Sequence, residues 1–320
     1  MNTKKDESHI LLVGNGINIC KESNDTPIKW HEILGKVQDL LVPGFLESEN
    51  KIDAENTSIS STLLFESLCN KNTEQTVRES VRKTIEQSTN DIYDFGVWDI
   101  YDTILTTNFD DNLIKTAPKG KSRNEPKIFN KDKYLSRRFD LPLSKKIFYI
   151  HGFYKIPESI CLGFDHYITN LTKIQSFVKS NYPNPKSKKF ISQKEGKRKS
   201  ISWVDYFFAE NTSIDIVGLN LCSEELDLWW LLKHRSKYSS LLKNNKIRYY
   251  DLDNFLDTGK SKEENQEKNN SIRDKKIILN SMNVEVVPIT HSEACKAYDK
   301  VFYEQCFKTI KNFYKKEEIK

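Results

Sequence analysis

The stretch "HILLVGNGIN", residues 9–18, places a short apolar run directly before a Gly-Asn-Gly turn. An apolar run of this length is typical of a buried strand. Glycines after such a strand let the backbone approach a diphosphate, whose charge is favoured by the N-terminus of the next helix. The full fingerprint Gly-x-Gly-x-x-Gly is absent, because Ile19 stands at the third glycine position. Taken alone, the stretch is better explained as an ordinary strand and turn.

Short apolar runs recur along the chain and alternate with segments whose apolar residues have helical spacing. The predicted strands are residues 9–13, 103–107, 146–150, 213–218, 247–252 and 283–287. The predicted helices are residues 28–41, 73–88, 223–242 and 291–314, the last two each opened by a serine cap. This alternation predicts an α/β fold with a mainly parallel sheet and helices on both faces.

Composition narrows the class of protein. A net charge of +5 over 320 residues permits an anionic ligand but does not demand nucleic acid. No apolar stretch approaches the length of a membrane span, and the N-terminus lacks the apolar core of a secretory signal, so we expect a cytoplasmic protein without membrane contact. The six cysteines are scattered, with no C-x-x-C pair, which argues against a zinc ribbon or a disulfide framework. We expect them to be reduced and mostly buried.

Two polar stretches, residues 183–200 and 258–276, are predicted to be exposed insertions. The first is rich in lysine and raises the alternative of a nucleic-acid-binding protein. It has only one aromatic residue with which to stack a base, so a solvated loop is the better interpretation.

Three further strands end in small polar residues. "ILTTNFDDNL" (104–113) presents Thr107, Asn108 and Asp110, and "KIFYIHGFY" (146–154) presents His151. The carboxyl ends of parallel strands form the ligand-binding edge of an α/β sheet. Side chains of this kind could equally cap the next helix or form turns. A histidine at that edge is a credible acid or base, with a purely structural role as the alternative.

The third of these stretches is "IDIVGLNLCSEELDLWW" (214–230), in which a strand ends in Gly218-Leu219-Asn220. A glycine and a small polar side chain there suit a second phosphate or a ribose. The acidic residues that follow, Glu224, Glu225 and Asp227, are interpreted as stabilising the first turn of a helix and not as catalytic.

In this order, GNGIN, TTNFD, HG and VGLN resemble the motifs of the Sir2 (sirtuin-like) superfamily. There the motifs are normally Gly-Ala-Gly-x-Ser, Thr-x-Asn-x-Asp, His-Gly and Gly-x-Ser. "PIKWHEIL" (27–34) and "PESICLGFDHY" (157–167) are similar to segments of its bacterial branch. The resemblance covers roughly residues 8–255. Asparagine replaces the usual small residue at three positions, Asn15, Asn18 and Asn220.

The resemblance implies a single Sir2-like domain over residues 1–320. Its Rossmann-like core would occupy about residues 8–43, 99–165 and 210–290, with a module of helical insertions at about 44–98 and 166–209 and a C-terminal helix at 291–316. The chain lacks the four-cysteine zinc module of sirtuin deacylases, so no zinc ribbon and no metal are expected. It is similar instead to the zinc-free NAD-cleaving effectors of bacterial anti-phage defence.

The resemblance also assigns roles to residues, with NAD as the substrate. Asn108 would hold a water, His151 would accept its proton, and Asp110 would position the ribose or the loop that carries Asn108. The predicted cofactor-binding residues are Gly14, Asn15, Gly16, Asn18, Thr107, Gly218 and Asn220.

The expected activity is NAD hydrolysis to nicotinamide and ADP-ribose. The alternatives are an ADP-ribosyltransferase and a non-catalytic sensor of NAD or ADP-ribose. We expect a homo-oligomer, a separate sensor or ATPase partner, or both, and no direct binding of nucleic acid.

Overall fold

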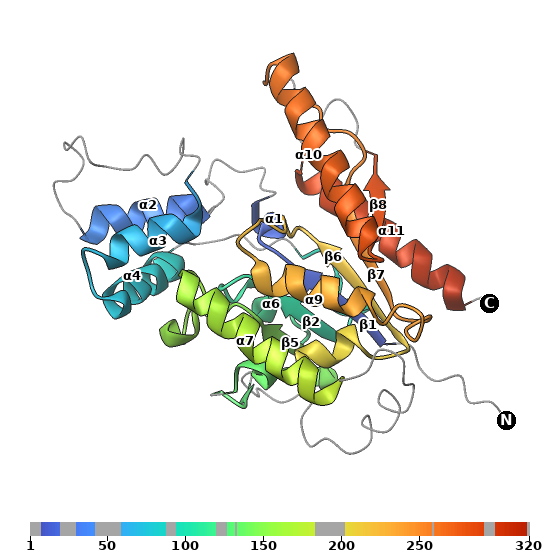
Figure 1. Ribbon diagram of the computed structural model, residues 1–320, viewed down its shortest axis with the longest axis horizontal. Helices are drawn as coiled ribbons and strands as arrows, with labels where there is room; N and C mark the ends of the chain where they lie inside the picture. Colours follow the sequence, from blue (N-terminus) through green and yellow to red (C-terminus); the bar gives the residue numbers. More distant parts are fainter. Residues whose placement is uncertain are drawn as a thin grey trace.

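The computed structural model describes residues 8–19, 30–41, 59–87, 94–119, 127–131, 133–182, 202–257, 259–290 and 298–318. These residues form a mixed α/β structure around one eight-stranded sheet (Figure 1). The strands are β1 (Ser8–Val13), β2 (Thr103–Thr106), β3 (Lys127–Phe129), β4 (Arg138–Asp140), β5 (Lys146–Tyr149), β6 (Thr212–Val217), β7 (Lys246–Leu252) and β8 (Glu285–Ile289).

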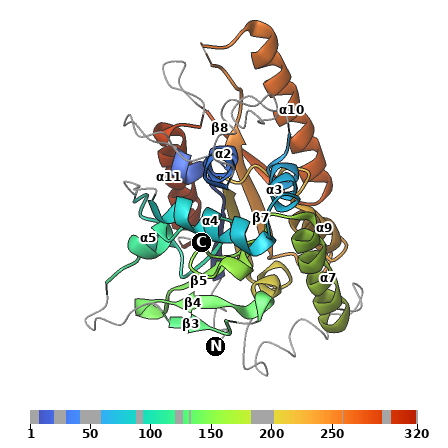
Figure 2. The ribbon, with the colours of Figure 1, turned by 90° about the vertical axis from the view of Figure 1, so that its left-hand side faces the viewer.

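The strands lie in the order β3-β4-β5-β2-β1-β6-β7-β8. Six of them, from β5 to β8 across the sheet, pair in parallel. β3 and β4 pair antiparallel and form the edge beyond β5 (Figure 2). The chain adds β2 and β5 on one side of β1 and then returns to the other side for β6, β7 and β8. The direction of these connections therefore reverses between β1 and β6, which makes this the topological switch point of the sheet.

Both faces of the sheet are buried because the central strands are apolar on both sides. In β1, Leu11 and Val13 enter one core, whereas Ile10 and Leu12 enter the other. The first core is shared with α2 (Trp30–Leu41), α3 (Ser61–Cys69), α4 (Glu74–Gln87), α5 (Val97–Ile100) and α11 (Lys300–Glu318). The second is shared with α7 (Phe164–Asn181), α9 (Leu226–Ser236) and the end of α10 (Lys262–Ser281).

Short helices complete the connections between these elements. They are α1 (Gly16–Ile19), α6 (Asn112–Lys115) and the 3-10 helices Tyr134–Ser136, Pro142–Ser144, Pro157–Ser159 and Trp203–Phe207. The prediction of a mainly parallel sheet with helices on both faces is confirmed, and each of the six predicted strands is present within two residues of its expected bounds. The sequence reading missed β3 and β4, which have three residues each.

Helix bounds differ from the predictions in three places. α9 begins at Leu226 and ends at Ser236, so the expected helix over 223–242 is shorter at both ends and Ser223 is not its cap. α11 begins at Lys300 and continues to Glu318, and residues 291–297 lie outside the described part of the chain. The predicted insertion at 258–276 contains most of α10, which begins with a capping box: Glu264 N donates to Ser261 Oγ and Ser261 N donates to Glu264 Oε2.

Other predictions concern the surface and the cysteines. In the described ranges, no helix has both the length and the apolar character needed to cross a membrane. Cys161 and Cys306 are buried, Cys69 is half-buried and Cys222 is exposed, and all four are free thiols. The lysine-rich stretch 183–200 lies outside the described residues.

Candidate functional site at the carboxyl edge of the sheet

The structure brings the four predicted motifs to the same edge of the sheet. In the strand register, Val13 of β1 pairs with both Thr106 of β2 and Val217 of β6, and Thr106 pairs with Tyr149 of β5. The four strands β5, β2, β1 and β6 are therefore neighbours whose carboxyl ends are level. Because neighbouring strands lie about 4.8 Å apart, the motifs that follow them form one continuous edge, with the switch point between β1 and β6 at its centre.

The glycines of the first motif are needed for close packing of two turns. Gly14 N donates to Val217 O at 3.1 Å and Gly16 N donates to Gly218 O at 2.8 Å. A Cβ on Gly14 would lie 2.6 Å from Gly218 O, and a Cβ on Gly16 would lie 2.2 Å from Tyr303 Oη of α11. The backbone N–H groups of Gly14 and Gly16, which were predicted to face a diphosphate, thus donate to carbonyl groups of the protein itself.

Asp110 ties the loop after β1 to the loop after β2. Its Oδ2 accepts from Asn18 Nδ2 at 2.9 Å, and its Oδ1 accepts from Asn112 N at 2.9 Å. Asn18 Nδ2 also donates to Asn15 Oδ1 at 3.0 Å, and Asn112 Nδ2 donates to Asn18 Oδ1 at 3.1 Å. Burial raises the pKa of Asp110, an effect that the hydrogen bond from Asn112 opposes. Because both carboxylate oxygens accept from loop residues, this geometry fits the positioning of the loop.

Asn108 is buried at the tip of β2 with one end of its side chain unsatisfied. Its Nδ2 donates to Gly14 O at 3.3 Å, and its backbone N donates to Thr106 Oγ1 at 3.0 Å. The buried Oδ1 has no hydrogen-bond partner in the described part of the protein. The adjacent Thr107 N donates to Val13 O at 3.1 Å, which fixes the loop against β1. A buried amide oxygen without a partner is unfavourable, so Asn108 Oδ1 is a candidate acceptor for a ligand or a water.

His151 is buried at the tip of β5 and is held by an acidic partner. Its Nε2 donates to Asp227 Oδ2 at 3.1 Å, and the two side chains are 3% and 0% exposed. Burial opposes a charged imidazole, but the Asp227 carboxylate outweighs burial and raises the pKa of His151. Nδ1 has no hydrogen-bond partner among the described residues. Asp227 thereby sets the tautomer and leaves Nδ1 as the proton acceptor.

The turn after His151 depends on a glycine. Gly152 has a φ of 112°, and an added Cβ would lie 2.2 Å from the carbonyl oxygen of Ser159. The carbonyl of His151 accepts from Cys161 N at 2.7 Å. These contacts anchor the backbone on both sides of the imidazole, so the ring is held by its chain as well as by Asp227.

The sequence reading missed two acidic residues of this site. Asp227 does lie in the first turn of α9, as predicted for helix stabilisation, yet its carboxylate also contacts His151. Glu225 is buried beside this pair, and its Oε2 accepts from Cys222 N at 3.0 Å. Burial raises the pKa of Glu225 to about 7, although His151 opposes the rise. The available signal was the pair of acidic residues on either side of Leu226, at the start of the helix that follows β6, and this pattern alone does not show which way the carboxylates point.

The edge continues to Asn220, whose side chain meets a lysine from a distant helix. Asn220 is exposed, and its Oδ1 accepts from Lys275 Nζ of α10 at 3.3 Å. Lys275 Nζ also lies 3.4 Å from Tyr249 Oη, and that hydroxyl donates to Leu219 O at 2.7 Å. The sequence reading missed Lys275 because it lies within the stretch predicted to be an exposed insertion.

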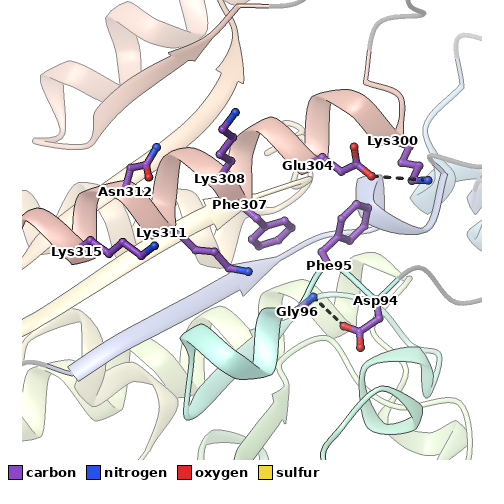
Figure 3. A pocket seen from close by; sticks show the side chains of 10 residues that line it. All are labelled: Asp94, Phe95, Gly96, Lys300, Glu304, Phe307, Lys308, Lys311, Asn312 and Lys315. Carbon is purple, nitrogen blue, oxygen red and sulfur yellow. Dashed lines mark hydrogen bonds and ion pairs between the residues drawn. The ribbon is translucent and has the colours of Figure 1, made fainter.

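A groove of about 610 Å³ lies elsewhere, along α11 and the segment before α5 (Figure 3). Phe95 stacks on Phe307 at 5.5 Å, and Lys308, Lys311 and Lys315 follow one another along the helix. None of the predicted site residues lines this groove. In the part of the chain that the structure describes, no group of three or more His, Cys, Asp or Glu side chains is arranged to hold a metal ion.

The sequence matches no protein-family model and no curated protein. The class of protein is defined by the architecture and the site alone. It is a mixed α/β protein with a mostly parallel sheet. Buried polar and titratable side chains from β2, β5 and α9 gather at the carboxyl edge of that sheet.

Proposed function

We propose that this protein is an NAD glycohydrolase of the zinc-free, Sir2-like kind, with a Rossmann-like core. Counted in chain order, its six parallel strands lie 3-2-1-4-5-6 across the sheet, which is the order of dinucleotide-binding sheets. Such sheets bind their ligand outside the carboxyl ends of the strands, at the switch point. Here the edge on both sides of that point carries Asn108, His151 and Asn220.

The chemistry of NAD cleavage suits these side chains. Nicotinamide leaves as a neutral molecule, because the electron pair of the breaking bond goes to its positively charged ring nitrogen. A water must then bond to C1′ of the ribose, and that water must lose a proton. Asn108 Oδ1 accepts a hydrogen bond from the water, and Nδ1 of His151 accepts its proton. Asp227 stabilises the imidazolium that forms, and the proton then passes to solvent.

One observation carries the proposal. At neighbouring strand tips, the protein buries an amide oxygen without a partner and an imidazole whose tautomer is set by a buried carboxylate. A protein that only bound NAD or ADP-ribose has no need of a base held in this way. The raised pKa of His151 has a kinetic consequence: hydrolysis should become faster as the pH rises through that pKa, because only the neutral imidazole accepts a proton.

The test is to add NAD to the purified protein and to follow nicotinamide and ADP-ribose by chromatography. Asn108→Ala and His151→Ala should each lower nicotinamide release by about 10²-fold or more. Circular dichroism should show that both variants remain folded. Full activity in both variants would refute the assignment of these residues. Nicotinamide release with label transferred to protein, and no free ADP-ribose, would identify the transferase instead.

The proposal includes a biological setting. A protein that hydrolyses NAD without control would deplete its own cell, which fits an anti-phage effector whose activity is restrained until infection. We propose that a homo-oligomer or a partner protein supplies this restraint. Gel filtration that gave a monomer with full activity would contradict that part of the proposal.

A further inference from the structure

Lys275 places its amino group at the carboxyl edge of the sheet without an anionic partner among the described residues. It extends from α10, the helix between β7 and β8, to the turn that follows β6. Its two hydrogen bonds, to Asn220 Oδ1 and Tyr249 Oη, are long, at 3.3 and 3.4 Å. An ammonium group has three N–H donors, so at least one donor remains for another acceptor.

The surroundings of Lys275 are unfavourable for a charge that has no counter-ion. In the described ranges, no carboxylate oxygen lies within ion-pair distance of its Nζ. The nearby Asp251 is engaged, because its Oδ1 accepts from Tyr298 Oη at 2.7 Å and from Leu252 N at 2.9 Å. Burial accordingly lowers the pKa of Lys275, although Asp251 opposes the shift. A bound anion would supply the missing counter-charge.

The position of Lys275 relative to the proposed reaction indicates which anion this is. His151 and Asn108 follow β5 and β2, so the reacting nicotinamide ribose belongs on that side of β1. The diphosphate of a dinucleotide belongs at the switch point between β1 and β6. The adenosine ribose then lies beyond the switch point, over the tips of β6 and β7. Asn220 follows β6, and Tyr249 is a residue of β7, so Lys275 stands beside that ribose.

We propose that Lys275, together with Asn220, binds the 2′-phosphate of NADP, so that the protein accepts NADP as well as NAD. This inference rests on the proposed function and extends it to a second substrate. A carboxylate beside the adenosine ribose accepts from a free 2′-hydroxyl, whereas a cation beside it accommodates a 2′-phosphate. The exposed Asn220 side chain offers its amide N–H groups to the same phosphate.

A binding measurement tests the site without requiring turnover. The probes are adenosine 2′,5′-bisphosphate and 5′-AMP, which differ only in the 2′-phosphate, with affinities measured by calorimetry on the full chain. The wild type should bind the bisphosphate about ten- to a hundred-fold more tightly, as expected for a charge-assisted hydrogen bond. Lys275→Met should abolish the preference. Lys276→Met, at the exposed neighbouring lysine, should retain it.

Equal affinities of the wild type for both probes would overturn the proposal. So would a preference for the bisphosphate that survives in Lys275→Met, or an affinity that falls equally for both probes in that variant. Failure of the wild type to bind either probe would count against it as well. Nicotinamide release from NAD and from NADP separates this inference from the proposed function. Cleavage of NAD without cleavage of NADP would refute only the inference. A 2′-phosphate preference that depends on Lys275, without cleavage of either dinucleotide, would support the binding site and give no support to the glycohydrolase.

Discussion

Replacing Glu225 with glutamine should make the protein more stable at alkaline pH. Burial raises the pKa of this carboxyl from 4.5 to about 7 in the folded protein. A group whose pKa is raised on folding contributes stability below its unfolded pKa and loses that contribution as the pH rises through its folded pKa. A shift from 4.5 to about 7 corresponds to a loss of about 3 kcal/mol across this window, since one pKa unit is worth 1.36 kcal/mol.

Glutamine cannot ionise, yet it keeps an oxygen that can accept from Cys222 N. Below pH 4.5 the free energies of unfolding of Glu225→Gln and wild type should therefore be similar. At pH 8 the variant should be more stable by about 3 kcal/mol. Urea unfolding followed by circular dichroism at pH 4, 5, 6, 7 and 8 measures both profiles.

The adjacent Glu224 provides a matched control with the opposite sign. Hydrogen bonds outweigh burial and lower the pKa of Glu224, so its ionised form stabilises the folded protein above its ordinary pKa. Glu224→Gln should therefore be less stable than wild type at pH 8 and no different at low pH. If the difference between Glu225→Gln and wild type does not change between pH 4 and pH 8, Glu225 is not buried as an ionisable group and the reasoning is wrong.

Two further predictions concern the loop that carries the imidazole. Asp227→Asn removes the carboxylate charge that raises the pKa of His151, whereas the imidazole stays buried. The midpoint of its NMR titration should therefore fall below 6.5, and an unchanged midpoint would show that the pair does not form. Gly152→Ala combines a φ of 112° with a Cβ 2.2 Å from Ser159 O and should lower the free energy of unfolding by about 3 kcal/mol. Gly259 is exposed, and an added Cβ there meets no backbone atom, so Gly259→Ala should change the free energy of unfolding little. Urea unfolding that showed equal effects of the two alanine substitutions would contradict the geometry.

The position of the candidate site was predictable because two simple patterns coincide there. Continuous apolar runs identified the central strands, and small polar residues followed them directly. Asn108 and His151 were found in this way. Asn108 and His151 lie close only because β2 and β5 are neighbours in the sheet and their ends are level. The order of the strands and their register are tertiary properties that the sequence pattern does not show. Chain order alone would have allowed the two tips to lie far apart.

The acidic partner of His151 was not predictable from local pattern. An acid in the first turn of a helix is favourable by itself, because it interacts with the helix dipole, so Asp227 already had a sufficient explanation. Its second contact depends on how α9 packs against the loop after β5, which is a tertiary property. Lys275 was missed for a related reason. It lies in a highly charged stretch that favoured an exposed insertion, although the capping box at Ser261 and Glu264 indicated a helix.

The packing of the glycine turns decides which variants can test a dinucleotide site. A side chain on Gly14 or Gly16 would collide with Gly218, whether or not a diphosphate binds there. Loss of activity in Gly14→Ala would therefore report a displaced turn, and it would be expected equally of a protein that never binds NAD. Asn108 is less affected by this ambiguity, because truncation leaves space unfilled instead of overfilled. It removes an oxygen that has no hydrogen-bond partner in the described part of the protein, and its cost to the turn is the single 3.3 Å hydrogen bond from Nδ2 to Gly14 O. A folded Asn108→Ala protein that has lost NAD cleavage thus argues for a ligand at this edge, which no glycine variant does.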